Sequence, residues 1–276
     1  MDYLKIGKAT DLEDKDRKLY RAFEILPGSL SWATLLILLV MSYFKPVWVA
    51  YFIIAFDVYW LLLVVYLGLH LLSAYRKLRQ NIKINWEEKC KALALNNDLA
   101  QKKIDKNCLY NKGVSWEDVV HLIILPTYNE SADVIRPTFQ ALIEDGFPAN
   151  KMIVVLAIEE REGQKAIDKA EIIKAEFAGR FRNFLVTVHP DDIAGELKGK
   201  GANQAWAARE VKGKIIDAQG LDYDKILVSV FDIDTVVRPG YFFCLTYKFL
   251  TVKDPYRASY QPVPVYHNNI WQAPFF

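Results

Sequence analysis

Two long apolar stretches dominate the first third of the chain. Residues 25–44 contain no charged side chain, and residues 47–72 contain only one, Asp57. A helix needs about 20 apolar residues to cross the hydrocarbon core of a bilayer, and these stretches hold 20 and 26 residues. Only Lys45 and Pro46 separate them. The pattern therefore predicts a transmembrane helical hairpin over residues 25–72, with the lipid bilayer as a partner. The alternative is a hairpin buried inside a soluble protein.

The charges on either side of the hairpin predict its orientation. Residues 1–24 carry six Lys and Arg, the turn carries one, and residues 76–113 carry ten. Basic flanks remain on the cytoplasmic side of a membrane. We therefore expect an integral protein of the plasma (inner) membrane, with the N-terminal segment 1–24, the C-terminus and the following domain in the cytoplasm. The basic connector 73–114 is predicted to form one or two amphipathic helices.

From about Ser115 the pattern changes to short apolar runs that alternate with segments of helical spacing. Alternation of strands and helices indicates an α/β domain with a mainly parallel sheet, predicted here over residues 115–276. Ligands bind beyond the carboxyl ends of the strands of such a sheet. The predicted strands are Val119–Leu125, Met152–Ile158, Phe184–Val188, Lys225–Phe231 and, less regular in pattern, Arg257–Gln261. The predicted helices are Val134–Ile143, Gln164–Phe177, Ala202–Lys212 and Gly240–Val252.

Two polar segments of this domain carry distinct chemistry. Asp232 and Asp234 directly follow the predicted strand Lys225–Phe231, so both carboxylates can reach one cavity. Hard divalent cations prefer oxygen ligands, and a cation held there can neutralise a leaving diphosphate. The segment 198–201, Lys-Gly-Lys-Gly, precedes a predicted helix and is typical of a phosphate contact. A solvated basic loop is the equally weighted alternative for the segment 198–201.

Composition narrows the choice of partner. The whole chain carries 35 Lys and Arg against 33 Asp and Glu. Residues 115–276 carry 18 basic and 22 acidic side chains, a net charge of −4. A nucleic-acid-binding domain is usually basic, so nucleic acid is not expected as a partner. Three cysteines are too few and too scattered for a disulfide or zinc framework. A small phosphorylated ligand bound together with a metal ion fits better.

Four motifs, taken in order, resemble those of the family 2 glycosyltransferases with the GT-A fold. They are LPTYNE at 125–130, the acidic pair that ends the second strand, KGKGANQAWA at 198–207 and FDIDTVVRPGYF at 231–242. The resemblance covers roughly residues 119–271. With the predicted hairpin in front of it, this domain is similar to the membrane-embedded polysaccharide synthases. The fold class that it implies is α/β with a GT-A domain, preceded by a two-helix transmembrane hairpin.

The resemblance also implies roles for the motif residues at the nucleotide end of the site. We call the residues that directly follow a strand its strand exit. The exit of the first strand would surround the nucleotide, which implicates Thr127, Tyr128 and Glu130. An acid at the second strand exit would contact the base. Here Glu159 and Glu160 replace the usual aspartates, and the sequence does not distinguish between them. A UDP-sugar is the favoured donor.

The remaining motif residues belong to the diphosphate end. Lys200 and Asn203 would contact the diphosphate or the sugar. Asp232 would lie near the ribose or the metal, and Asp234 would ligate Mg²⁺ or Mn²⁺. The implied reaction transfers a sugar with inversion from the nucleotide-sugar to a polysaccharide or lipid-linked acceptor. The acceptor hydroxyl attacks the anomeric carbon while a carboxylate removes its proton.

One departure from the family pattern leaves alternatives open. The family's catalytic base is an aspartate downstream of the Asp-x-Asp pair, but the only acid after Asp234 is Asp254, which fits a turn better. We therefore leave the catalytic residue unassigned and expect the domain to be incomplete at its C-terminus. The main alternative is a non-catalytic membrane scaffold or a nucleotide-sugar sensor. A nucleotidyltransferase is a weaker one, because LPTYNE lacks the glycines of its characteristic loop.

Overall fold

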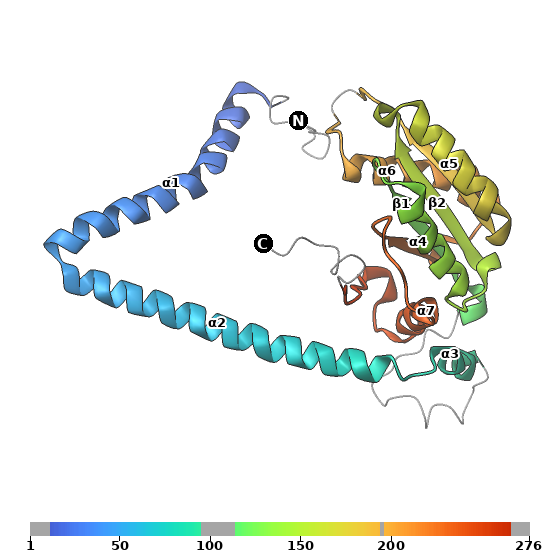
Figure 1. Cartoon of the computed structure of the whole chain (residues 1–276), viewed down its shortest axis with the longest axis horizontal. Helices are drawn as coiled ribbons and strands as arrows, with labels where there is room; N and C mark the ends of the chain where they lie inside the picture. Colours follow the sequence, from blue (N-terminus) through green and yellow to red (C-terminus); the bar gives the residue numbers. More distant parts are fainter. Residues whose placement is uncertain (1–11, 95–113, 194–195, 266–276) are drawn as a thin grey trace. The chain divides into compact units, whose positions relative to one another are not determined.

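The computed structural model of the protein describes residues 12–94, 114–193 and 196–265 (Figure 1). The chain divides into two compact units, residues 1–84 and residues 85–276. The first unit is helical and the second has an α/β architecture.

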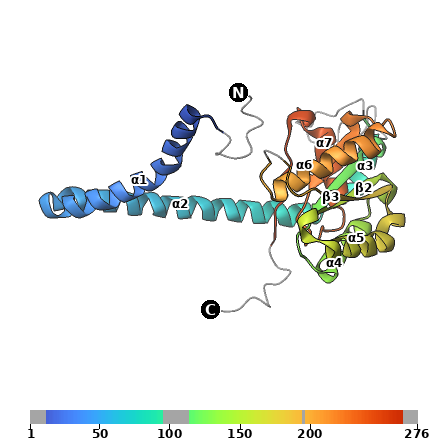
Figure 2. The ribbon, with the colours of Figure 1, turned by 90° about the horizontal axis from the view of Figure 1, so that it is seen from above.

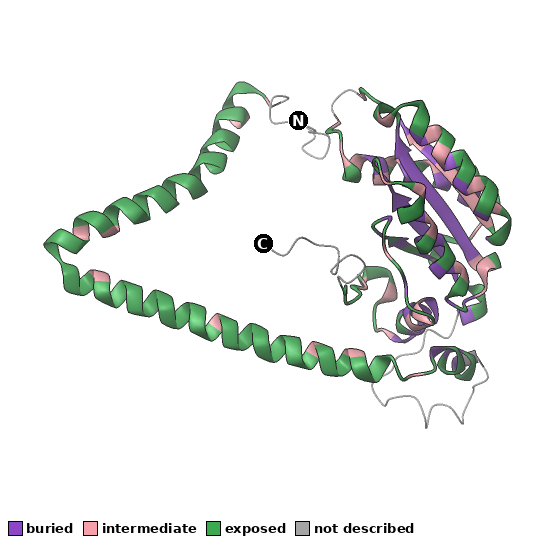
Figure 3. Cartoon of the chain, in the orientation of Figure 1, coloured by how far each residue is buried: buried purple, intermediate pink, exposed green. Residues whose placement is uncertain are grey.

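The first unit consists of two long helices. Helix α1 spans Asp14–Phe44 and helix α2 spans Pro46–Asn81, with Lys45 between them. Pro46 takes the first position of α2, where its missing N–H costs no helical hydrogen bond. Neither helix contains a buried residue (Figure 3). Both are long and apolar enough to cross a membrane, which suggests membrane association. Both extend past the predicted stretches 25–44 and 47–72 into charged sequence.

The connector predicted at 73–114 is partly helical. Its first residues, 73–81, continue α2, and a separate helix, α3, spans Trp86–Ala94. Helix α3 packs against helix α7, Tyr241–Thr251. In this contact the Cys90 thiol donates a hydrogen bond to the Phe243 carbonyl at 3.2 Å. Residues 95–113 of the predicted connector lie outside the described residues. Helix α3 thus belongs to the α/β unit.

The α/β unit is built on a four-stranded sheet in which all strands are parallel. The strand order is β3-β2-β1-β4. The strands are β1 Val120–Pro126, β2 Met152–Glu159, β3 Asn183–His189 and β4 Ile226–Val230. Every residue of β1 and β2 is buried. Four of the five predicted strands are therefore confirmed, with ends that differ by at most one residue.

Helices cover both faces of this sheet (Figure 2). Helix α6 and the π-helical turn that follows it pack on the face that carries Val120, Leu122 and Ile124. Helices α4 and α5 lie on the other face, where the Phe139 ring stacks on Phe177 at 5.3 Å between centroids. The helices are α4 Ala132–Glu144, α5 Gln164–Phe177, α6 Lys200–Val211 and the π turn Lys212–Asp217. Short 3-10 helices span Trp116–Asp118, Ala149–Lys151, Glu160–Glu162, Ala178–Arg180, Tyr223–Lys225 and Pro255–Arg257.

The prediction of a strand at residues 257–261 is wrong. The 3-10 helix Pro255–Arg257 occupies its start, and residues 258–265 form neither helix nor strand. Pro262 and Pro264 directly follow the predicted end of this strand. A proline has no N–H to donate to a sheet. Strand β4 consequently lies at an edge of the described sheet.

Candidate functional site

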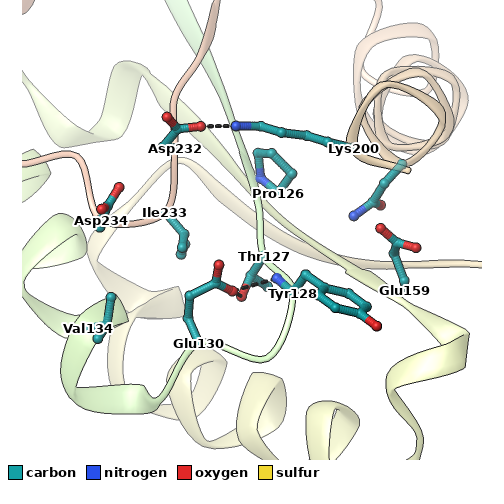
Figure 4. A pocket seen from close by; sticks show the side chains of 11 residues that line it. Pro126, Thr127, Tyr128, Glu130, Val134, Glu159, Lys200, Asp232, Ile233 and Asp234 are labelled. Atoms are coloured by element: carbon teal, nitrogen blue, oxygen red, sulfur yellow. Dashed lines mark hydrogen bonds and ion pairs between the residues drawn. The ribbon is translucent and has the colours of Figure 1, made fainter. Parts of the chain in front are cut away.

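A cavity of about 300 Å³ opens at the carboxyl ends of β1, β2 and β4, beside the first turn of α6 (Figure 4). We call it the exit pocket. Eight of the nine candidate residues line it, and Glu160 does not. The lining residues are Pro126, Thr127, Tyr128, Glu130, Val134, Glu159, Lys200, Asn203, Asp232, Ile233 and Asp234.

The loop after β1 is organised around one carboxylate. The Thr127 hydroxyl donates to Glu130 Oε2 at 2.6 Å, and the Tyr128 N–H donates to the same oxygen at 2.5 Å. The Thr127 N–H extends the sheet by donating to the Ala157 carbonyl at 2.9 Å. Glu130 is therefore turned back on its own loop. The Tyr128 side chain is left at the pocket with 47% of its surface exposed.

The second strand exit separates the two adjacent glutamates. Glu159 ends β2 with a side chain only 5% exposed, and Arg161 Nε donates to its Oε2 at 2.5 Å. This hydrogen bond raises the pKa of Arg161. The Arg161 guanidinium also lies over the Tyr128 ring, 4.7 Å from its centroid. Glu160 instead accepts from the Asp191 N–H at 2.9 Å. Glu159 therefore belongs to the pocket and Glu160 does not.

The two lysines of the segment 198–201 also differ in their surroundings. Lys200 is the first residue of α6 and forms an ion pair with Asp232 across the pocket. Lys198 pairs with Asp191 and Asp192 at 2.5 and 3.0 Å and does not line the pocket. The N-terminal end of α6 adds its own partial positive charge beside Lys200. This end of the pocket is thus suited to an anion.

Asn203 contributes a buried acceptor one turn further along α6. The residue is only 1% exposed, and its Nδ2 donates to the Ala157 carbonyl at 3.0 Å. Its Oδ1 has no hydrogen-bond partner among the described residues. Buried polar atoms are normally paired, and Asn203 Oδ1 is an exception among the residues that line the pocket.

The exit of β4 presents two carboxylates on an anchored loop. Ile233 is buried between them, and its carbonyl accepts from the Thr138 hydroxyl of α4 at 2.5 Å. The described residues contain no group of three or more His, Cys, Asp and Glu side chains that could hold a metal. Mg²⁺ in nucleotide sites is commonly held by one or two carboxylates plus substrate phosphates. Asp232 and Asp234 supply two such carboxylates, and Asp232 is paired with Lys200 in this structure.

Two charged residues beside the pocket were not among the candidates. Arg161 joins the side chains of Glu159 and Tyr128, and Glu162 joins the two strand exits through their backbone. Glu162 lies three residues after Glu159, just before a helix, which is the spacing of a capping box. That spacing is a signal by which Glu162 could have been found.

The fold and the site define a class of protein, an α/β domain with a charged pocket at the carboxyl edge of its parallel sheet, preceded by two apolar helices. No protein-family model matches the chain, and no curated protein matches it.

Proposed function

We propose that the protein is a membrane-anchored family 2 glycosyltransferase with a GT-A domain. It would transfer a sugar, with inversion, from a nucleotide-sugar to a polysaccharide or lipid-linked acceptor at the cytoplasmic face of the plasma membrane. The proposal is carried by one observation. Four segments far apart in the sequence, each of which resembles a motif of that family, meet in the exit pocket.

The chemistry of the pocket supports a nucleotide diphosphate lying across it. Tyr128 offers an exposed ring on which a base can stack, and the carboxylate of Glu159 can accept a hydrogen bond from a base N–H. Lys200 and the start of α6 would hold the diphosphate. Asn203 Oδ1 would accept from a donor hydroxyl. Figure 4 shows the Tyr128 ring and Glu159 at one end of the pocket, which we call the aromatic end, and Asp232 and Asp234 at the other, with Lys200 reaching across to Asp232.

Asp234 and Asp232 would hold Mg²⁺ or Mn²⁺ on the diphosphate. The cation would stabilise the charge that develops on the leaving nucleoside diphosphate. The general base stays unassigned. Asp254, the one acid after Asp234 in the sequence, precedes the 3-10 helix Pro255–Arg257 and does not line the pocket.

Calorimetric titration tests the proposal most directly. The full chain in detergent is titrated with UDP, GDP, CDP, dTDP and ADP, each with and without Mn²⁺. We expect one nucleotide, UDP, to bind in a metal-dependent way, and Asp234→Asn to weaken that binding by about tenfold or more. Asp168→Asn, the same substitution on the exposed surface of α5, is the matched control and should bind like wild type.

The other outcomes separate the competing functions. A folded chain that binds no nucleotide would contradict the proposal and favour a membrane scaffold. Binding of a nucleotide-sugar without turnover, even with added acceptors, would favour a sensor. Release of pyrophosphate from a nucleoside triphosphate would favour a nucleotidyltransferase. Where sugar is transferred, long products indicate polymer synthesis and single additions indicate transfer to a lipid carrier.

A further inference from the structure

Glu162 connects the two strand exits that form the aromatic end of the pocket, although it does not line the pocket itself. Its Oε2 accepts from the Asn129 N–H, in the loop after β1, at 2.7 Å. Its Oε1 accepts from the Glu159 N–H, at the end of β2, at 3.0 Å. One carboxylate thus joins the backbones of two neighbouring exits.

The loop that Glu162 holds has a conformation that needs support. Asn129 has a φ of 64°, in the left-handed region that few residues other than glycine adopt, although asparagine tolerates it. On the other side of the loop, Lys169 Nζ of α5 donates to the Glu130 carbonyl at 2.6 Å. Glu162 and Lys169 therefore hold the loop from its two sides.

The position of this bridge gives it a functional consequence. Tyr128 immediately precedes Asn129, and Glu159 is itself one of the two bridged residues. Fixing both N–H groups to one carboxylate fixes the separation of the two backbone segments that carry the Tyr128 ring and the Glu159 carboxylate. Arg161 connects the same two residues through their side chains. A planar ligand that stacks on the ring and hydrogen-bonds to Glu159 needs that separation to be constant.

We propose that Glu162 is a positioning residue of the nucleotide site, acting on Tyr128 and Glu159 without touching the ligand. What it positions rests on the proposed function, namely that the pocket binds a nucleotide. Hydrogen bonds from backbone N–H groups to a carboxylate are among the stronger ones in proteins. Their loss opens an edge loop rather than the core, and such openings are local. The main effect of losing Glu162 is therefore on ligand affinity.

The test uses the full chain in detergent with Glu162→Ala, Glu162→Gln and Glu171→Gln. Glu171 lies on the exposed surface of α5, so its substitution is the matched control. Two quantities are measured: the affinity for UDP with Mn²⁺, and the hydrogen-exchange rates of the Asn129 and Glu159 amides. We expect Glu162→Ala to weaken UDP binding about tenfold and to speed exchange at both amides, while the unfolding midpoint moves by only about 2 °C. Glu162→Gln keeps one acceptor oxygen and should fall between wild type and Glu162→Ala.

The outcomes separate this inference from the proposed function. If wild type binds UDP and Glu162→Ala binds it equally well, the positioning role is overturned and the proposed function stands. If affinity and unfolding midpoint fall in parallel, Glu162 is merely structural and the inference is also overturned. If wild type binds no nucleotide, the proposed function is contradicted, and unchanged amide exchange in Glu162→Ala would remove the bridge as well.

Discussion

The helical unit and the α/β unit are both rich in large apolar side chains but treat them in opposite ways. Phe56 of α2 is 50% exposed, whereas Phe139 of α4 is 0% exposed. No residue of α1 or α2 is buried, whereas all of β1 is buried (Figure 3). Soluble proteins seldom expose apolar surface on this scale. This contrast is the one expected if the helical unit associates with a membrane, so one substitution should have different consequences in each unit.

Removing a phenylalanine from each unit should give the largest difference. Phe139→Ala leaves a cavity between α4 and α5 and should lower the free energy of unfolding of the α/β unit by about 3–5 kcal/mol. Phe56→Ala should leave that transition within about 0.5 kcal/mol, because its ring takes no part in the α/β core. Guanidinium unfolding of the full chain in detergent, followed by near-ultraviolet circular dichroism, measures both. Equal losses in the two variants would abolish the contrast between the units.

A charge placed on two similarly exposed residues, one in each unit, tests whether the helical unit spans a membrane. Leu61 of α2 and Val228 of β4 are 63% and 58% exposed. Leu61→Arg puts a charge in the middle of a predicted membrane span and should cost about 2.5–3.5 kcal/mol of insertion free energy. Val228→Arg puts it in water at a sheet edge and should change membrane retention and unfolding by less than about 0.5 kcal/mol. Alkaline extraction of membranes measures retention, and equal retention of the two variants would argue against a spanning hairpin.

The strands were the most predictable part of the fold. The runs VVHLIIL and MIVVLAI contain no polar side chain except one histidine and are bounded by polar turns, and both form buried strands. The prediction of a fifth strand was wrong because residues 258–261, ASYQ, have a weak strand pattern and are flanked by prolines. A proline has no N–H to donate to a neighbouring strand. The outer ends of the two long apolar helices were also missed. Helix α2 continues to Asn81 because no glycine or proline follows Leu72 to stop it, although the apolar run has ended.

The site was predictable in its location but not in the direction of its side chains. Parallel strands end at one edge of a sheet, so Thr127, Glu159 and Asp234 were expected to converge, and they do. Neighbouring acids at one exit are chemically equivalent in the sequence. Only the backbone geometry shows that Glu159 enters the pocket and that Glu160 accepts from Asp191 outside it. Glu130 likewise turns toward its own loop.

The smallest net effect in wild type concerns Asp145, a buried carboxylate of the α/β unit. Asp145 follows α4 and accepts from the N–H groups of Tyr241 and Phe147 at 2.7 and 3.3 Å, which ties α4 to the start of α7. Burial raises its pKa from 3.8 to about 6. The folded state therefore keeps a proton that the unfolded state loses. The contribution of Asp145 to stability is complete below about pH 4 and is lost as the pH rises through 6, by roughly 3 kcal/mol at most.

In wild type, the pH dependence that Asp145 gives to stability is offset by that of His121. Removing either group should therefore uncover the pH dependence of the other. Burial in β1 lowers the pKa of His121 from 6.5 to about 3. The unfolded state thus takes up the extra proton, and the stability due to neutral His121 is lost as the pH falls below 6.5. Between pH 4 and pH 6 the two slopes oppose each other, so wild type should be nearly flat. Asp145→Asn should lose stability on acidification across this window, and His121→Leu should gain it. Guanidinium unfolding at a series of pH values measures all three proteins, and parallel profiles would show that neither group titrates differently on folding.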